Sequence, residues 1–500
     1  MRLLVALALL IVPTALAQDY VPRDERGSLD ARTQAELDGN RVHTSAFNFG
    51  QSGRTGASPG MVPYEWPAES RQHYVALTGL FVGAEVQSAA GQTVAIVNVP
   101  NYRENQPDPD EAWTWAPVPE YLGGGEVARS DRPETWPAVW PDKLGDADDP
   151  GWSGAWNGLL GKDAVIDGVE LFAHYSDDGY SRNREAASTS YYPDSTDLDR
   201  AGLGLVVSER RLAFREPSVE DAVFAVRDIW NAGTEDLAGV GATVWLADLV
   251  GGDADGGDDE PVFFQDAAVV VFADEDGLSS DPAFPAGQTV GAAALVLLED
   301  PVGLGFTTVR HVLAGGVNYQ SVPDAWLFEE LMVPAAYAPF TPTGQDYDTF
   351  ASVGLFEIPA GTSVRFATAV VLGEVDYDVT DPALRFADVL QKAEQARSFY
   401  AAGFAVAEES GAASPGLELR ASPNPASGTV RLTFRLAAPQ PVEVDVLDAL
   451  GRRVARLADR PFAAGPHTLE WDARGQGAGV YLVRVRTEEA VHAQRVTRLR

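Results

Sequence analysis

The chain has 500 residues and no cysteine, and 73 acidic residues against 37 basic ones give it a formal net charge of −36. The lack of cysteine excludes disulfides, thiol catalysis, thiolate metal sites and iron–sulfur clusters. Because residues 421–500 hold 12 arginines against 8 acidic residues, the acidic excess lies in the rest of the chain. Phosphate binding needs a basic surface, so we expect no nucleic acid as a partner. The length predicts two to four domains.

Residues 1–17 have the composition of a secretory signal peptide. Arg2 precedes an apolar stretch from Leu3 to Val12, and the segment ends in the small-residue run Ala15-Leu16-Ala17. This order predicts cleavage between Ala17 and Gln18. No other window reaches the run of about eighteen apolar residues that a membrane helix needs, so we expect no transmembrane anchor in the mature chain.

The segment from 18 to 404 is predicted to be an all-β, sandwich-like body. Short β-branched and aromatic runs alternate with turn residues, and 48 glycines and 33 prolines fit many turns. We divide it into an N-terminal β-rich region with long loops, 18–205, and a sandwich-like region, 206–404. The strand candidates are Tyr74–Val86, Thr93–Val97, Leu203–Val207, Ala222–Trp230, Gly241–Asp248, Ala267–Ala273, Val290–Leu298 and Thr362–Leu372.

Residues 100–200 differ from the rest of the body because tryptophan, proline and aspartate replace continuous apolar runs. We expect long structured loops laid over a sheet. The tryptophans between 113 and 156 fit two roles. They could form an aromatic platform for sugar rings, or they could fill the space beneath the loops, which is the interpretation we favour.

One late helix is predicted over Asp381–Ala401, where apolar residues return every three or four positions. Asp381 is suited to cap its start, and Pro382 fits the first helical position. Residues 405–420 follow, small and acidic without periodicity, and are predicted to be a linker.

The densest acidic cluster spans 253–260 and suggests a calcium site. Carboxylates around glycines can surround Ca²⁺, which takes about six to eight oxygen ligands. The loop is not an EF-hand, since its sixth position is Asp258 and its twelfth is Phe263. The alternative is a solvated acidic turn that serves solubility. The candidate ligands are Asp253, Asp255, Asp258, Asp259 and Glu260, and poorer clusters occur at 146–149 and 274–277.

We predict no catalytic residue. The stretch Gly56-Ala57-Ser58-Pro59-Gly60 matches the nucleophile-elbow pattern, but Pro59 lacks the N–H that an oxyanion hole takes from this position. The six histidines show no metal-ligand spacing. A glycosidase needs only two carboxylates brought together in space, so the sequence leaves that chemistry open.

The last eighty residues alternate apolar with polar side chains in short runs, which predicts a small antiparallel sandwich over 421–500. Four ordered blocks, 424–426, 446–454, 464–469 and 479–484, resemble the type A C-terminal sorting domain of the type IX secretion system of Bacteroidota. They are also similar to the immunoglobulin-like domain of flagellar hook-capping proteins. A plain sandwich kept for adhesion or spacing is the alternative.

The resemblance implies export across the outer membrane by the type IX secretion machinery, followed by removal of the domain. Attachment to outer-membrane lipopolysaccharide is a common fate after processing. Residues 47–50, 64–67 and 77–84 also resemble large secreted Bacteroidota proteins of unknown function. We therefore expect an extracellular or outer-membrane-surface protein, a non-enzymatic binding or structural module. The alternative is a carbohydrate-active or other polymer-degrading hydrolase delivered by the same route.

Overall fold

The computed structural model forms two compact units, Met1–Ala405 and Val406–Arg500, called here the body and the C-terminal unit. Both the predicted cleavage site, Ala17 and Gln18, and most of the predicted linker lie outside the described residues. The described residues are 22, 25–54, 60–100, 114–178, 191–255, 257–314, 322–338, 340, 347–404, 420–422, 428–436, 439–448, 453–476, 479–486 and 491–498.

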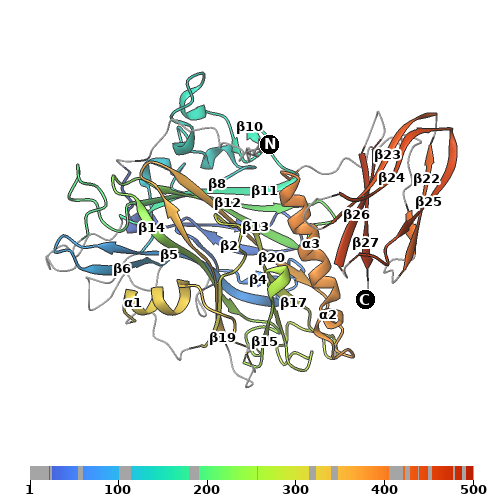
Figure 1. The fold of residues 1–500 in the computed structure, drawn as a ribbon. Coiled ribbons are helices and arrows are strands. Elements are labelled where there is room, and N and C mark those ends of the chain that lie inside the picture. Colours follow the sequence, from blue (N-terminus) through green and yellow to red (C-terminus); the bar gives the residue numbers. More distant parts are fainter. Residues whose placement is uncertain are drawn as a thin grey trace. The chain divides into compact units, whose positions relative to one another are not determined.

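Two antiparallel sheets make up most of the body (Figure 1). The first sheet runs in the order β1-β2-β3-β5-β14-β19-β18, with β4 and β6 also paired to β5. Its strands are β1 Gln34–Leu37, β2 Thr44–Phe47, β3 Gln51–Gly53, β4 Tyr64–Glu65, β5 His73–Gln87, β6 Thr93–Asn98, β14 Leu237–Asp248, β18 Thr308–Leu313 and β19 Tyr347–Ile358.

The second sheet runs in the order β15-β16-β17-β20-β13-β12-β11-β7, with β8 paired to β11. A separate short hairpin joins β9 and β10. The strands are β7 Ala116–Pro117, β8 Ala128–Arg129, β9 Asn157–Gly158, β10 Gly161–Lys162, β11 Gly168–Ser176, β12 Leu205–Phe214, β13 Ala222–Asn231, β15 Glu260–Phe264, β16 Val269–Ala273, β17 Ala292–Glu299 and β20 Ser363–Gly373.

The two sheets pack face to face around one apolar core, which confirms the all-β sandwich. Alternate residues of each strand point inward, such as Leu80 and Val244 from the first sheet and Val207 and Leu295 from the second. In the first sheet, β5 from the segment 18–205 pairs with β14 from the segment 206–404. In the second sheet, β11 from the first segment pairs with β12, which begins at residue 205. The two segments therefore share both sheets.

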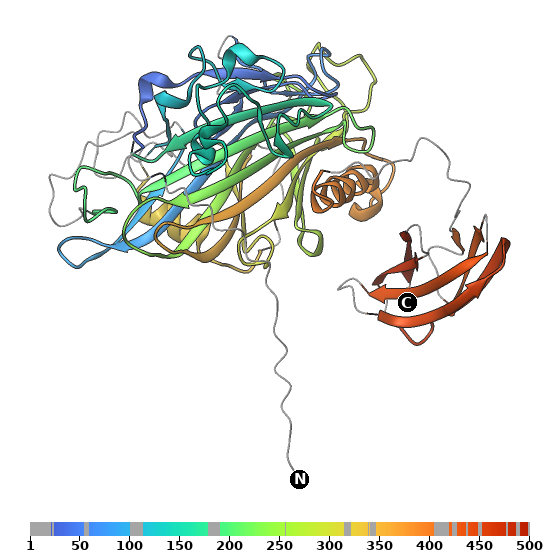
Figure 2. The same cartoon turned by 90° about the horizontal axis from the view of Figure 1, so that it is seen from above.

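The predicted late helix is confirmed, with one break. Asp381 accepts a hydrogen bond from the Ala383 N–H and caps α2, Pro382–Arg385, and α3, Ala387–Ala401, follows after a kink at Phe386. Val389 and Phe399 of α3 are buried against β17 and β20. Figure 2 views α3 almost along its axis, beside strands of the second sheet.

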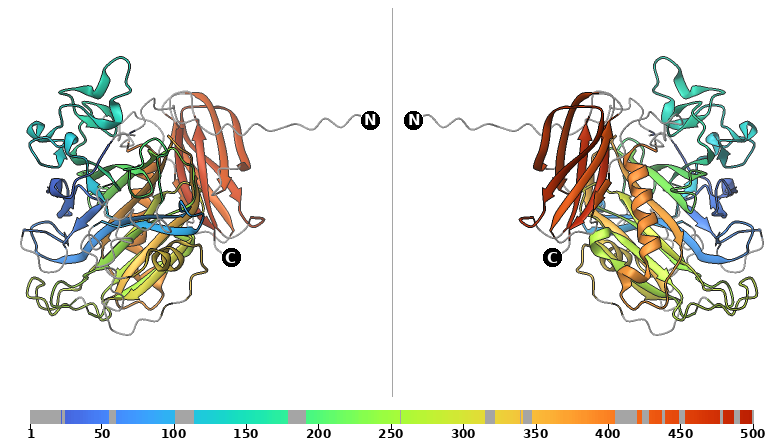
Figure 3. Two further views of the ribbon diagram at one scale, coloured as in Figure 1. Left: turned by 90° about the vertical axis from the view of Figure 1, so that its left-hand side faces the viewer. Right: turned by 90° about the vertical axis from the view of Figure 1, so that its right-hand side faces the viewer.

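The loops between β7 and β11 lie on the outer face of the second sheet, and β11 itself also falls in the region where loops were predicted (Figure 3). Trp140 and Trp156 are fully buried and pack with Phe172 of β11. They are not exposed to stack on a sugar. Four 3₁₀ turns here start with proline, at Pro119–Tyr121, Pro133–Thr135, Pro141–Lys143 and Pro150–Trp152; others are Leu29–Ala31 and Gln265–Ala267.

A short helix that the sequence did not predict covers the outer face of the first sheet. It consists of α1, Asp324–Leu327, and a π-helical turn, Phe328–Met332. Phe328 and Met332 are buried with Phe81 of β5. The helix is too short to give a periodic pattern in the sequence, which explains why it was missed.

The C-terminal unit is a small sandwich of two antiparallel sheets with an apolar core. On the strand over 479–486, Tyr481, Val483 and Val485 are buried in regular alternation. The sheets contain β21 Arg420–Ser422, β22 Thr429–Leu436 and β25 Gly465–Asp472, and β24 Arg453–Phe462, β23 Gln440–Asp448, β26 Gly479–Arg486 and β27 Val491–Arg498.

Candidate metal centre

Two acidic loops of the body meet at one end of the β15–β16 hairpin. The antiparallel register pairs Glu260 with Ala273, so the residue before β15 and the residue after β16 lie side by side. Those two residues are Asp259 and Asp274. The hairpin thereby brings the loop 249–259 against the loop 274–281.

Three carboxylates converge between these loops. Ligand oxygens of Asp255, Asp258 and Asp274 all lie within 4.8 Å of one another. Asp274 is fully buried, and the other two are partly buried. One cation could touch all three groups, since ligands on opposite sides of Ca²⁺ are about 5 Å apart at its usual bond length of about 2.3–2.6 Å.

Hydrogen bonds from the loops fix one carboxylate oxygen of Asp274 and one of Asp255. Asp274 Oδ1 accepts hydrogen bonds from the N–H groups of Gly277 and Leu278, the latter at 3.1 Å. Asp255 Oδ1 accepts from the Ser280 hydroxyl at 2.7 Å. The other oxygen of each, Oδ2, is buried without a hydrogen-bond partner. Buried acceptors in this state are uncommon and costly, and they indicate a ligand or a proton.

Burial and mutual repulsion disfavour the ionisation of all three carboxyl groups at once. Burial raises the pKa of Asp274 to about 7, and the nearby Asp258 and Asp255 add to the shift. Burial and the charge of Asp255 also raise the pKa of Asp258. Each shift reflects the cost of holding a carboxylate away from water and beside like charges.

The remaining predicted ligands have other partners in the structure. Asp253 contacts Arg54 and lies 3.7 Å from His73 Nδ1. Asp259 is buried and accepts a hydrogen bond from the Val250 N–H at 2.9 Å. Glu260 lies 3.5 Å from the Arg385 guanidinium.

Two of the five predicted ligands, Asp255 and Asp258, thus lie together, and the third carboxylate comes from the loop after β16. In the sequence, that loop stands apart as a separate, poorer cluster. The hairpin itself was the missing signal, because apolar runs at 261–264 and 269–273 flank a short turn and bring the acidic residues at their outer ends together.

The poorer cluster at 146–149 acts as a turn in the structure. Asp146 Oδ1 accepts hydrogen bonds from the N–H groups of Asp148 and Asp149, and its Oδ2 accepts from Trp152 Nε1 at 2.8 Å. These bonds, that of Trp152 first, lower the pKa of Asp146. Both of its oxygens are therefore already used by the loop.

A hydroxyl, an imidazole and a carboxylate lie in a row on the outer face of the second sheet. Ser208 Oγ lies 3.0 Å from His174 Nδ1, and His174 Nε2 contacts Glu25. The sequence gives no sign of this row, because the three residues are far apart in the chain. All three are buried, and the Tyr121 ring packs edge-on against His174. Since Ser208 and His174 are cross-strand partners, the row is best explained as a bond between β11 and β12.

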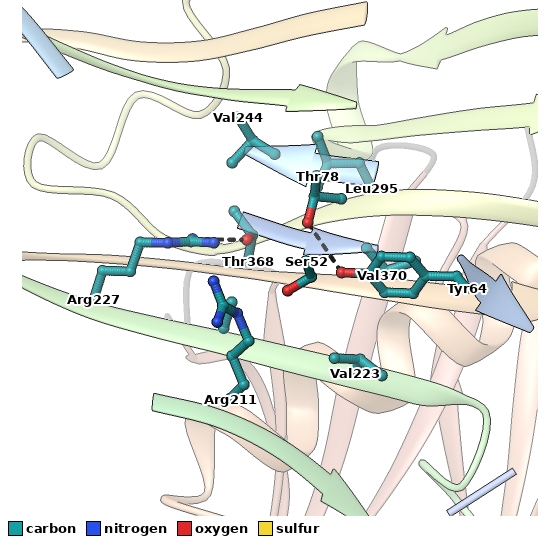
Figure 4. A pocket seen from close by; sticks show the side chains of 11 residues that line it. Ser52, Tyr64, Thr78, Arg211, Val223, Arg227, Val244, Leu295, Thr368 and Val370 are labelled. Carbon is teal, nitrogen blue, oxygen red and sulfur yellow. Dashed lines mark hydrogen bonds between the residues drawn. The ribbon is translucent and has the colours of Figure 1, made fainter. Parts of the chain in front are cut away.

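A cavity between the two sheets is too small for a substrate (Figure 4). Its volume is about 10 Å³, enough for about one water molecule. Tyr64 Oη lies 3.0 Å from Thr78 Oγ1 on one side, and Arg227 donates to Thr368 on the other. The cavity belongs to the polar interior of the sandwich.

Residues 421–497 match the family model of the secretion system C-terminal sorting domain. The C-terminal unit is a type IX sorting domain. The sorting domain marks the chain for export to the cell surface or the extracellular space, and it implies contact with the secretion machinery. Among the residues that the structure describes, no helix combines the length and the apolar character needed to cross a membrane.

No curated protein matches the chain. Among solved structures, a polysaccharide lyase is similar at 8% identity and a TM-score of 0.27, over 94% of this chain and 46% of its own. Dimeric latent PorU from Porphyromonas gingivalis is similar at 12% identity and a TM-score of 0.14, over 66% of this chain and 31% of its own. The chain spans less than half of either protein, and scores this low assign neither a fold nor an activity to the body.

Proposed function

We propose that the body acts outside the cell as a non-enzymatic binding or structural module, delivered there by the sorting domain. The observation that carries this proposal is that side chains of the types found in catalytic sites form buried structural hydrogen bonds here. Ser208 and His174 lie on the paired strands β12 and β11, and both side chains are buried together with Glu25. A nucleophile needs an open site beside it where substrate and oxyanion donors can meet.

The buried acid Asp177 supports the same proposal. Burial raises its pKa to about 7, a value suited to a general acid. Its Oδ1 accepts from the Leu205 N–H at 2.9 Å, and its Oδ2 accepts from the Leu203 N–H at 2.7 Å and from Asn98 Nδ2 at 3.1 Å. With both oxygens bonded, the carboxyl orders the start of β12.

After export, the mature module extends from Gln18 into the linker 405–420. Signal peptidase removes residues 1–17, and the secretion machinery removes the sorting domain. The processed chain is then released or attached to outer-membrane lipopolysaccharide. Mass spectrometry of the culture medium and of the outer membrane distinguishes these fates, since lipopolysaccharide adds mass to the new C-terminus.

A panel of glycans and other extracellular polymers tests the proposal, with each member scored for binding and for cleavage. We expect no release of reducing ends or fragments above a heat-denatured control, with or without calcium. Retention on a polymer would identify a binding module, and retention on none would favour a structural one. Cleavage of any member would overturn the proposal and support the hydrolase alternative.

A further inference from the structure

We propose that Asp255, Asp258 and Asp274 bind one Ca²⁺ ion, which fastens the loop 249–259 to the loop 274–281. This site is independent of the proposed function, since a binding module and a hydrolase could both carry it. The inference rests on the meeting of three carboxylates within 4.8 Å and on the buried Oδ2 of Asp274, which has no hydrogen-bond partner. A cation supplies the positive charge that these buried oxygens require.

Arg385 lies beside the site, and both of its terminal nitrogens face other groups. Arg385 donates through Nη2 to the backbone oxygen of Asp274 at 3.1 Å, and its Nη1 lies 3.5 Å from Glu260. Its guanidinium also lies over the Tyr377 ring, 4.7 Å from the centroid. These contacts of Arg385 are to the backbone of Asp274, to Glu260 and to Tyr377, and none of them is to the side chains of the three carboxylates.

The surrounding loops hold the carboxylates ready for a ligand. Ser280 fixes Asp255, and the turn at Gly277 fixes Asp274. Gly251 has a positive φ of 88°, and a Cβ at this position would lie 2.7 Å from Asp255 Oδ2. Groups that orient ligating carboxylates in this way raise the affinity of metal sites.

The ligand chemistry favours Ca²⁺ over other cations. Carboxylates are hard oxygen ligands, whereas Zn²⁺ in proteins prefers nitrogen and sulfur. Mg²⁺ demands a tighter, nearly octahedral shell, and Ca²⁺ accepts the irregular geometry that two loops provide. Extracellular modules function with calcium sites as weak as about 10⁻⁴–10⁻³ M, and the sorting domain sends this chain outside the cell.

The competing state is a cluster without a metal, in which one carboxyl keeps its proton and donates it to a neighbouring carboxylate. The melting temperature of the full chain, measured after EGTA treatment and again after calcium is added, distinguishes the two states. Calcium at one hundred times its Kd should raise the melting temperature of the body by about 3 °C. Sodium chloride at the same ionic strength should give a much smaller change.

The double variant Asp255→Asn with Asp274→Asn removes two charges while keeping the shape of the side chains. It should lose the calcium response, and its melting temperature in EGTA should equal or exceed that of the parent, because like charges no longer repel. Asp266→Asn with Glu275→Gln is the matched control, since both residues are exposed and the charge change is the same. This control should keep the full calcium response.

Calorimetric titration of the parent should give one Ca²⁺ per chain, and the double variant should give none at this site. If the double variant does not fold, Asp258→Asn decides the question by the same two measurements. The proposal is overturned if sodium reproduces the effect of calcium, or if the calcium response survives in the double variant or in Asp258→Asn. A parent that binds no Ca²⁺ also overturns it and favours the protonated cluster.

Discussion

The sorting domain and the body are both β-sandwiches, but their interiors differ in chemistry. In the sorting domain the described core is apolar, with Val430, Phe434, Val444 and Val483 among its members. The body also has an apolar core, but it buries whole ion pairs among those apolar residues. An apolar interior can be recognised from alternation in the sequence, whereas a charged interior is evident only when the partners are seen together.

The charged interior of the body centres on Glu209 of β12. Its Oε1 accepts from Arg227 at 2.9 Å, and its Oε2 accepts from Arg211 at 3.0 Å and from the Tyr175 hydroxyl at 2.9 Å. Arg211 also donates to the backbone oxygen of Phe47 at 2.7 Å. This network links the second sheet to β2 of the first. Removing one member of such a network is strongly destabilising, because it leaves a buried charge without its partner.

The largest effect is expected from Trp471→Ala in the sorting domain. Trp471 is 2% exposed and packs against Tyr481 with ring centroids 5.0 Å apart. The change should cost about 4 kcal/mol, a large share of the stability of a small domain. Scanning calorimetry should show the transition of the sorting domain lowered or lost and that of the body unchanged. Arg474→Ala, at an exposed ion pair with Asp472, should leave both in place.

If Trp471→Ala lowers both transitions together, the two units do not unfold separately and the comparison fails.

The next effect is expected from Glu209→Gln in the body. Loss of this charge leaves Arg211 and Arg227 buried without their anion, which should lower the free energy of unfolding by about 3 kcal/mol. Asp228→Asn is the matched control, because Asp228 pairs with Arg365 near the surface. Denaturant unfolding should show a cost below about 1 kcal/mol for the control. Equal costs would mean that the buried network has no special role.

Strand β12 shows where sequence patterns stop being informative. The sequence predicts a strand over Leu203–Val207, and the polar run Ser208-Glu209-Arg210-Arg211 follows it. The structure continues it to Phe214 with every residue buried. Glu209 and Arg211 face the core between the sheets, and Arg210 faces Glu170 on the other side. Glu209 and Arg211 pair with each other, but Arg227 and Glu170, further charged partners of this run, come from different strands. The run alone therefore does not predict its own burial.

The same limit applies to the candidate metal centre. The segment 253–260 was recognised from its carboxylates, yet three of its five candidates have basic or backbone partners. Asp274 enters the cluster only through the β15–β16 hairpin. By contrast, the strands β5, β13 and β20, and the helical segment formed by α2 and α3 together, were placed within about two residues, because their apolar spacing depends only on local sequence.

A smaller effect is expected from the pH dependence of His43. The hydrogen bond to Glu36, at 2.8 Å, and that to Glu65, at 3.0 Å, raise the pKa of His43 to about 9 from its usual 6.5. The raised pKa contributes stability that is fully present below about pH 6.5 and is lost as pH rises through about 9. Because the side chain is 24% exposed, we expect about 1–2 kcal/mol.

Unfolding of the parent and of His43→Gln at pH 6, 7.5 and 9.5 measures this contribution. The difference between the two proteins should shrink steadily toward pH 9.5. A difference that is constant with pH would show that the charge on His43 does not stabilise the body.

Deletion of residues 421–500 tests the division of labour between the two units most directly. Each described apolar core is built from residues of one unit only, so the body should fold without the sorting domain. In a host with a type IX system, fractionation should find the full chain outside the cell and the truncated chain in the periplasm. The truncated body should keep the melting temperature of the parent body. A truncated chain that reaches the cell surface would contradict the account.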